Sequence, residues 1–229
     1  MRNRSHLLLL VLLLAAAPLA VAGAASKLVL DYSVKLDGDS VGTSKATLEY
    51  TDGGSTLKLV TRIKTTFMGA KVEMGGTTLI EYDDKGRALS FDISHYKPGE
   101  KVHATGSRTD GGGWDIERKK GKKTKKVRIE DSEYDRVSIE KALYAGEVGT
   151  KKKVRVLFAG QGKVKKATIS VLGREDAHVM GRDASLVHFK IKSSNGTVEE
   201  WRLDDGVLVK SRIHSPIGKI LIKLKDTTK

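Results

Sequence analysis

The chain of 229 residues contains no cysteine and carries a formal net charge of +14 at pH 7. The lack of cysteine excludes disulfides, thiolate nucleophiles and sulfur metal ligands, while the positive charge favours anionic partners through long-range attraction. Its 24 glycines and only 3 prolines are typical of strands joined by tight turns.

The amino terminus has the three parts of a secretory signal peptide. Arg2 and Arg4 give a positive start, Leu7 to Ala22 is apolar, and Ala22-Gly23-Ala24 supplies small residues for cleavage. A membrane anchor is the alternative, but a spanning helix needs about 20 apolar residues, and this run is shorter. We therefore expect residues 1–24 to be a signal peptide that is removed on export to the periplasm or the extracellular space.

Cleavage would leave residues 25–229 as a single β-rich domain, not integral to a membrane, with a net charge of +12 once Arg2 and Arg4 are lost. Outside the cytoplasm, the anionic partners are phospholipid head groups, acidic glycans, other envelope polymers or an acidic protein. Nucleic acid is not expected as a partner, because the signal takes the chain away from it.

The first half of this domain alternates apolar and polar residues, which predicts half-buried antiparallel strands. Lys27 to Leu36 and Val41 to Tyr50 alternate cleanly. From Leu57 to Phe67 the apolar residues of the alternation lie at odd positions, and from Ala70 they lie at even positions. This change at Met68-Gly69 predicts a bulge or a short turn. Thr78 to Tyr96 then predicts a hairpin whose turn is formed by Asp83-Asp84-Lys85-Gly86.

The stretch from Asp131 to Tyr144 does not alternate and predicts one short helix near residues 135–145. Beyond it, Val164 to Leu172 predicts a strand, and Asn195-Gly196 is a strong signal for a two-residue hairpin turn. Val198 to His214 predicts a second hairpin around Asp204-Asp205-Gly206.

These patterns predict an all-β fold in which antiparallel meanders form a curled open barrel or two packed sheets. Because the two hairpins have similar turns, a second interpretation is that the domain consists of two similar halves, 25–130 and 148–229, joined by the short helix. Trp114 and Trp201 lie within alternating stretches, which favours core or rim positions over a ligand platform.

The most marked surface feature is a predicted hairpin with a lysine-rich tip. Its cations are Lys119, Lys120, Lys122, Lys123, Lys125, Lys126 and Arg128. One interpretation is an anion-binding site, because clustered ammonium groups attract phosphates and carboxylates. The other is a solvated hairpin whose charges prevent edge-to-edge sheet pairing. The run contains no interleaved aromatic residue, which argues against a base-stacking surface for nucleic acid.

No catalytic residue, metal site or cofactor is predicted. His95 and His103 flank a Pro-Gly turn and would face each other across a hairpin, but two ligands without a third do not make a metal site. Asp83-Asp84 and Asp204-Asp205 precede glycine, so they are interpreted as turn formers rather than calcium ligands. The G-x-S-x-G motif of many hydrolases is absent from the sequence.

Several short motifs resemble those of an exported bacterial β-domain that often precedes transglutaminase-like catalytic domains. They are Asp37-Gly38-Asp39-Ser40-Val41-Gly42, Phe67-Met68-Gly69, the Glu81 to Phe91 hairpin, Ile169 to Glu175, and Glu200-Trp201 before the Asp204-Asp205-Gly206 turn. The chain is also similar in outline to uncharacterised periplasmic proteins with a curled sheet like that of lipoprotein carriers. The resemblance implies a non-catalytic role, because the catalytic domain and its cysteine are missing here.

We therefore expect an exported, non-enzymatic binding or accessory domain that contacts an anionic component of the cell envelope through its basic surface. One alternative is a carrier that holds an apolar ligand or lipid against the concave face of the sheet. A second alternative is a hydrolase whose Ser, His and Asp residues converge only in the folded chain.

Overall fold

The computed structural model describes residues 26–67, 69–131, 148–204, 206–215 and 218–225. The predicted signal peptide (1–24) and the predicted short helix near 135–145 lie outside these described residues. Within the same ranges, no helix is long and apolar enough to cross a membrane.

Strands dominate the described part of the chain. The first eight are β1 (Lys27–Leu36), β2 (Asp39–Thr51), β3 (Gly54–Phe67), β4 (Ala70–Asp83), β5 (Ala88–Lys97), β6 (Glu100–Arg108), β7 (Trp114–Lys120) and β8 (Lys123–Ile129). The others are β9 (Lys151–Phe158), β10 (Lys163–Val179), β11 (Arg182–Ser193), β12 (Gly196–Arg202), β13 (Leu208–Ser215) and β14 (Gly218–Leu224). A short 3-10 helix, η3 (Ala159–Gln161), lies between β9 and β10.

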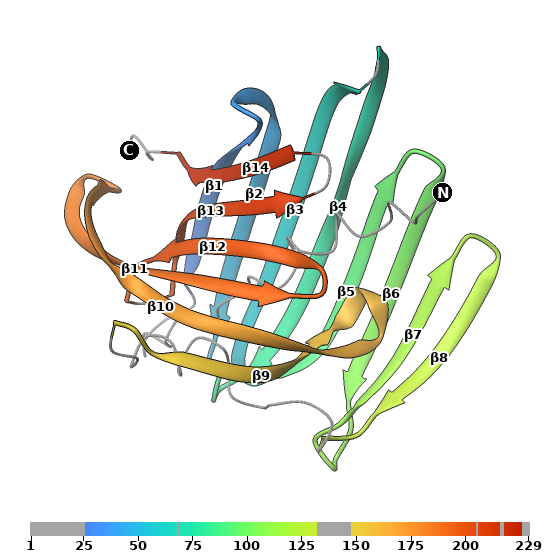
Figure 1. The fold of residues 1–229 in the computed structure, drawn as a ribbon. Helices are drawn as coiled ribbons and strands as arrows, with labels where there is room; N and C mark the ends of the chain where they lie inside the picture. Colours follow the sequence, from blue (N-terminus) through green and yellow to red (C-terminus); the bar gives the residue numbers. More distant parts are fainter. Residues whose placement is uncertain (1–25, 68, 132–147, 205, 216–217, 226–229) are drawn as a thin grey trace.

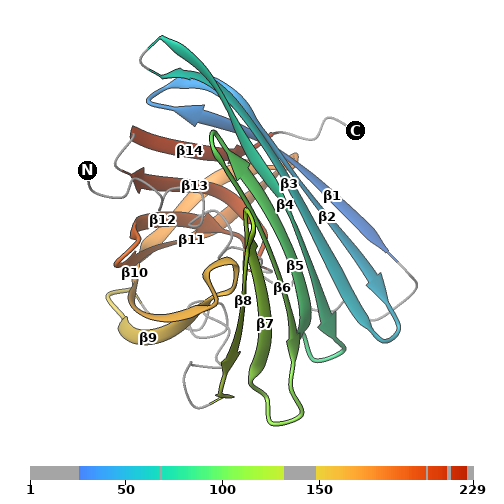
Figure 2. The ribbon, with the colours of Figure 1, turned by 90° about the vertical axis from the view of Figure 1, so that its right-hand side faces the viewer.

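All fourteen described strands belong to one antiparallel sheet, in the order β8-β7-β6-β5-β4-β3-β2-β1-β14-β13-β12-β11-β10-β9. The pairing of β1 with β14 joins the early strands to the late ones. Strands β9–β14 cross over one face of β1–β8 (Figure 1), and the side view shows the two groups as facing layers (Figure 2). Because β8 and β9 end the sheet without pairing to each other, it is a curled open barrel, and the all-β prediction is confirmed.

The face enclosed by the two layers, called the inner face, is apolar. On β1 it carries Leu30, Tyr32 and Val34, which are 3%, 4% and 0% exposed. Across the join, Val34 is paired with Ile222 of β14, so the same core continues into the late strands. Alternation along each strand places the intervening residues on the outer face.

A smaller part of the core lies where η3 meets strands β5 to β7. Phe91 and Trp114 pack there with ring centroids 5.2 Å apart. Arg118 of β7 donates from Nε to the Gly160 carbonyl oxygen of η3 at 3.0 Å. This contact ties the end of β9 to the early strands, so the curl is held by packing and hydrogen bonds although the edges are unpaired.

The predicted turns between β3 and β4 and between β4 and β5 are confirmed. The turn predicted at Asn195-Gly196 lies one residue earlier, at Ser194-Asn195, because Gly196 is already paired with Ser193. Strand β3 ends at Phe67 and β4 begins at Ala70, so the parity change marks a short turn and not a bulge. In the next hairpin, Asp83 Oδ1 accepts hydrogen bonds from the backbone N–H groups of Lys85 and Arg87, at 3.0 and 2.8 Å. Gly86 has φ of 70°, the left-handed conformation that glycine adopts without strain.

Strand β10 is longer than the predicted strand at Val164 to Leu172, because it continues to Val179. A register shift between Val171 and Gly173 changes the parity of the pairing with β11. The charged residues Arg174, Glu175 and Asp176 that follow are exposed, so no apolar alternation marks this part of the strand, although Val179 at its end is buried in the core.

Candidate functional site

The lysine-rich run is a hairpin, as predicted, formed by β7 and β8 at one edge of the sheet. We call Lys119–Arg128 the lysine hairpin. Its seven predicted binding cations are all exposed. On the outer face, Glu117 lies 3.2 Å from Lys119 and 3.8 Å from Lys126, while Asp115 lies 3.1 Å from Arg128. These exposed pairs contribute little stability but neutralise part of the charge.

Of the other cations of the lysine hairpin, Lys120 pairs with a carboxylate of the neighbouring strand β6. Lys120 Nζ lies 2.5 Å from Glu100 Oε2, and Lys97 Nζ lies 3.7 Å from Oε1 of the same carboxylate. Burial alone would raise the pKa of Glu100, but hydrogen bonding to Lys120 and the nearby positive charges lower it. Among the described residues, no carboxylate lies within 4.0 Å of the ammonium groups of Lys122, Lys123 and Lys125.

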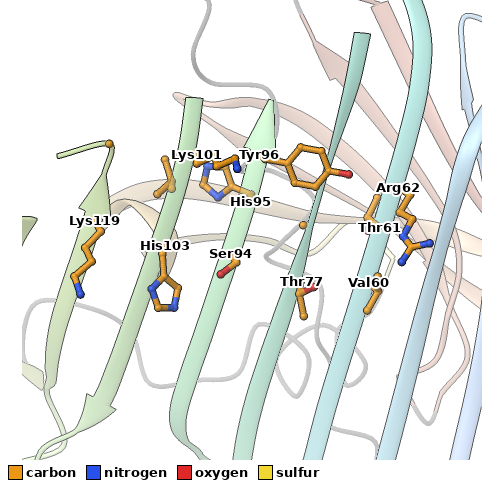
Figure 3. A pocket seen from close by; sticks show the side chains of 13 residues that line it. Val60, Thr61, Arg62, Thr77, Ser94, His95, Tyr96, Lys101, His103 and Lys119 are labelled. Atoms are coloured by element: carbon orange, nitrogen blue, oxygen red, sulfur yellow. The ribbon is translucent and has the colours of Figure 1, made fainter. Parts of the chain in front are cut away.

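A groove of about 700 Å³ crosses the outer face from β3 to β7 (Figure 3). Residues paired across neighbouring strands lie side by side, so its walls are two rows of cross-strand neighbours. One row contains Val60, Thr77, Ser94, His103 and Lys119, and the other contains Arg62, Tyr96 and Lys101, with Gly75 paired between Arg62 and Tyr96. Between the rows, the floor is formed at Thr61, Gly76, His95 and Val102.

Two glycines of β4 allow the strands to pack closely beneath the groove. A Cβ on Gly75 would lie 2.3 Å from the Thr61 carbonyl oxygen, and one on Gly76 would lie 2.5 Å from that of Ser94. The Cβ position of Gly75 is also only 3.2 Å from Tyr96 Oη, so the tyrosine reaches over this glycine. The absence of a side chain at Gly75 therefore leaves room for the Tyr96 ring at the centre of the groove.

The charged residues that line the groove are basic. Arg62 lies at one end and Lys101 and Lys119 at the other (Figure 3). Among the described residues, neither Asp nor Glu lines it, and no carboxylate lies within 4.0 Å of the Arg62 or Lys101 charged groups. Cationic donors without a protein partner suit a carboxylate or phosphate ligand.

Of the seven predicted binding residues, the structure places only Lys119 in the groove, where it joins Arg62 and Lys101. No sequence pattern marks Arg62 or Lys101 as binding residues, because each is a single cation in an alternating strand. Only the pairing of five strands brings them into one groove. The remaining six cations lie on the adjoining lysine hairpin.

The family model matches residues 32–225. This chain belongs to the family described as Domain of unknown function (DUF6134). Among solved structures, it is similar to a beta-barrel-like protein of Domain of Unknown Function DUF1849 from Brucella abortus, with a TM-score of 0.64. That likeness covers 90% of this chain and 98% of the other at 13% sequence identity, which shows the fold alone. No curated protein matches the sequence.

The two histidines predicted to face each other in this DUF6134 chain do not. His95 is paired with Val102 and lies on the inner face, whereas His103 is paired with Ser94 on the outer face. That prediction was wrong because neighbouring positions of a strand point to opposite faces.

A serine, a histidine and an aspartate lie close together at the groove. His103 Nε2 lies 3.0 Å from Asp92 Oδ1, and His103 is paired with Ser94 on the neighbouring strand. Activation of a serine requires a hydrogen bond to its base, and none joins the Ser94 hydroxyl to His103 among the contacts of the described residues.

The inner face contains a polar group that the sequence did not reveal. Glu200 and Arg202 are 1% and 2% exposed, and Arg202 Nε donates to Glu200 Oε2 at 2.9 Å. Burial raises the pKa of Glu200, and the Arg202 charge opposes that rise. Glu200 is paired with Ser211 of β13. Four buried inner-face atoms lack a hydrogen-bond partner within the described chain: Thr78 Oγ1, His95 Nδ1, Glu200 Oε1 and Ser211 Oγ.

Trp114 and Trp201 are buried, with exposures of 5% and 3%, as expected for core or rim residues. Trp201, however, is buried on the outer face. Its ring stacks on that of His188 at 4.0 Å, and Lys210 Nζ lies 3.9 Å from the ring centroid. The long side chain of Lys210 covers the indole, which leaves Glu200 and Arg202 to point inward.

Proposed function

We propose that this chain is an exported, non-catalytic binding domain of the cell envelope that holds an anionic partner in the outer-face groove and against the adjoining lysine hairpin. The observation that carries the proposal is the groove lining, in which the charged residues Arg62, Lys101 and Lys119 are all basic and no carboxylate takes part among the described residues. Salt should weaken the binding, because screening acts over about 8 Å at physiological ionic strength.

Charge reversal in the groove tests this proposal. The variant Arg62→Glu with Lys101→Glu removes two cationic donors, and each contact to a charged group contributes about 1.5–3 kcal/mol, or roughly tenfold or more in affinity. The control Lys192→Glu with Lys223→Glu makes the same change in net charge at exposed positions of β11 and β14. Binding is measured to polygalacturonate and to phosphatidylglycerol vesicles at low and physiological salt.

The proposal expects salt-sensitive binding that the groove variant loses and the control variant keeps. Equal losses in the two variants would show that only net charge matters, and would reject the groove as the binding site. Failure of the unmodified protein to bind either anionic probe would reject the proposed function itself.

A second candidate function is a carrier of a ligand enclosed by the sheet. Four buried polar atoms of the inner face have no partner among the described residues, and they favour this function because buried polar groups ordinarily have a partner. Native mass spectrometry of the purified protein would show a co-purified lipid if this function is correct. A mass equal to that of the chain alone would reject it.

The hydrolase alternative is favoured by one contact, between His103 and Asp92 beside Ser94. These three residues lie on exposed strands, and no oxyanion site is found beside them among the described residues. We therefore rank the hydrolase alternative third. Hydrolysis of a nitrophenyl ester that Ser94→Ala abolishes would support it, and hydrolysis unchanged by this substitution, or none, would reject it.

A further inference from the structure

The shape of the groove limits what can enter it. The groove spans β3 to β7, which is four inter-strand spacings, or about 19 Å. Its walls are two residues apart along each strand, which separates them by about 7 Å. A long, narrow groove across the strands accommodates a single extended chain, whereas a flat bilayer surface does not enter it.

The cations are distributed along the groove. Arg62 is on β3 and Lys101 is on β6 in the same row, so three strand spacings, about 14 Å, separate their backbones. Tyr96 lies between them in that row and reaches over Gly75. A ligand with anionic groups spaced along its length therefore matches this arrangement better than a single phosphate or carboxylate.

The centre of the groove is lined by hydroxyl groups and an aromatic ring, whereas its ends are basic. Thr77 and Ser94 place hydroxyl groups in one wall, and Tyr96 extends from β5 towards β4 in the other (Figure 3). Tyr96 Oη donates to Glu73 Oε1 at 3.4 Å, which holds the ring across Gly75. An aromatic ring with nearby hydroxyl groups suits a ligand made of rings that carry hydroxyl groups.

We infer that the ligand of this groove is a linear acidic polysaccharide lying across strands β3 to β7, with acidic groups at Arg62 and at Lys101 and Lys119 and a sugar ring against Tyr96. This inference rests on the proposed anion-binding function and specifies its ligand. The lysine hairpin extends the positive surface beyond one end of the groove, so a longer polymer continues onto Lys122, Lys123 and Lys125.

Oligomer length provides the test. Isothermal titration calorimetry compares galacturonic acid oligomers from the monomer to the octamer, with neutral maltose oligomers of equal length as controls. Affinity should rise about tenfold or more once an oligomer spans the groove, because its second contact becomes intramolecular. Beyond that length the rise should become shallow, and neutral oligomers should not bind.

Tyr96 supplies the matched variants. Tyr96→Ala should lower the affinity for the long oligomer several-fold while leaving the weak affinity for inorganic phosphate unchanged, and Tyr96→Phe should retain the oligomer affinity. Circular dichroism and thermal melting show whether each variant is folded. If Tyr96→Ala does not fold, the Tyr96→Phe variant and the length series still decide the question.

The outcomes separate this inference from the function on which it rests. Equal affinity for monomer and long oligomers, or binding confined to phosphatidylglycerol vesicles, would overturn the polysaccharide inference and leave an anion-binding protein. Failure to bind any anionic probe would overturn both. Length-dependent binding that the Arg62→Glu, Lys101→Glu variant abolishes would support both.

Discussion

Replacing Glu200 with alanine removes a carboxylate that lies 2.9 Å from Arg202 Nε on the inner face, where the two residues are 1% and 2% exposed. Arg202 Nη1 still donates to the Gly206 carbonyl oxygen at 2.7 Å, but its charge stays buried. Breaking a buried ion pair from one side costs about 3–5 kcal/mol. For a domain of this size, that corresponds to a fall in Tm of about 6–20 °C.

Replacing Arg202 with methionine has a different consequence, because the remaining carboxyl can bind a proton. Burial already raises the pKa of Glu200, and without the opposing Arg202 charge the rise should be larger. A raised pKa in the folded state gives stability that is fully present below the ordinary carboxyl pKa of about 4.3. That stability is lost as the pH rises through the folded-state pKa.

Urea and thermal unfolding at acid and mildly alkaline pH measure both effects. The control Glu49→Ala removes an exposed carboxylate that lies 2.7 Å from Lys27 Nζ, and it should leave Tm unchanged. An unchanged Tm for Glu200→Ala, or a destabilisation in Arg202→Met that is the same at both pH values, would show that this pair is not desolvated.

Three further predictions concern the strands and turns. Gly76→Ala should lower Tm sharply because its Cβ would lie 2.5 Å from the Ser94 carbonyl oxygen, whereas Gly53→Ala, with nothing within 4 Å, should not. Burial raises the pKa of Asp83, but the Arg87 hydrogen bonds and charge lower it overall, so Asp83 stabilises the fold above the ordinary carboxyl pKa and this stability is lost as pH falls. Asp83→Asn should therefore flatten the acid side of the stability curve measured by urea unfolding. Ser211→Ala should leave Tm equal or higher, since its hydroxyl lacks a partner among the described residues; a clear fall would point to a bound molecule.

The strands and turns could be predicted from the sequence because their signals are local. Leu30, Tyr32 and Val34 alternate with polar residues, and all three are buried on the inner face. Asp83 precedes a glycine at the predicted turn and accepts the hydrogen bonds that close it. Such patterns depend on residues only a few positions apart.

The groove could not be predicted, because it depends on register across five strands. Arg62 and Lys119 are far apart in the sequence, and nothing local to either one indicates that they line the same groove. The buried pair was missed for another reason. In strand β12 the apolar Trp201 lies outside beneath Lys210, so the charged Glu200 and Arg202 point inward, against the hydrophobic pattern.

The location of the anion site is tested most directly by chemical-shift mapping of the isotope-labelled protein during titration with an acidic oligosaccharide. We predict that the amide signals of Thr77, Ser94 and Lys101, which line the groove, shift with the bound fraction while those of β11 to β14 do not. Shifts confined to the lysine hairpin, or to residues of β11 to β14, would contradict it.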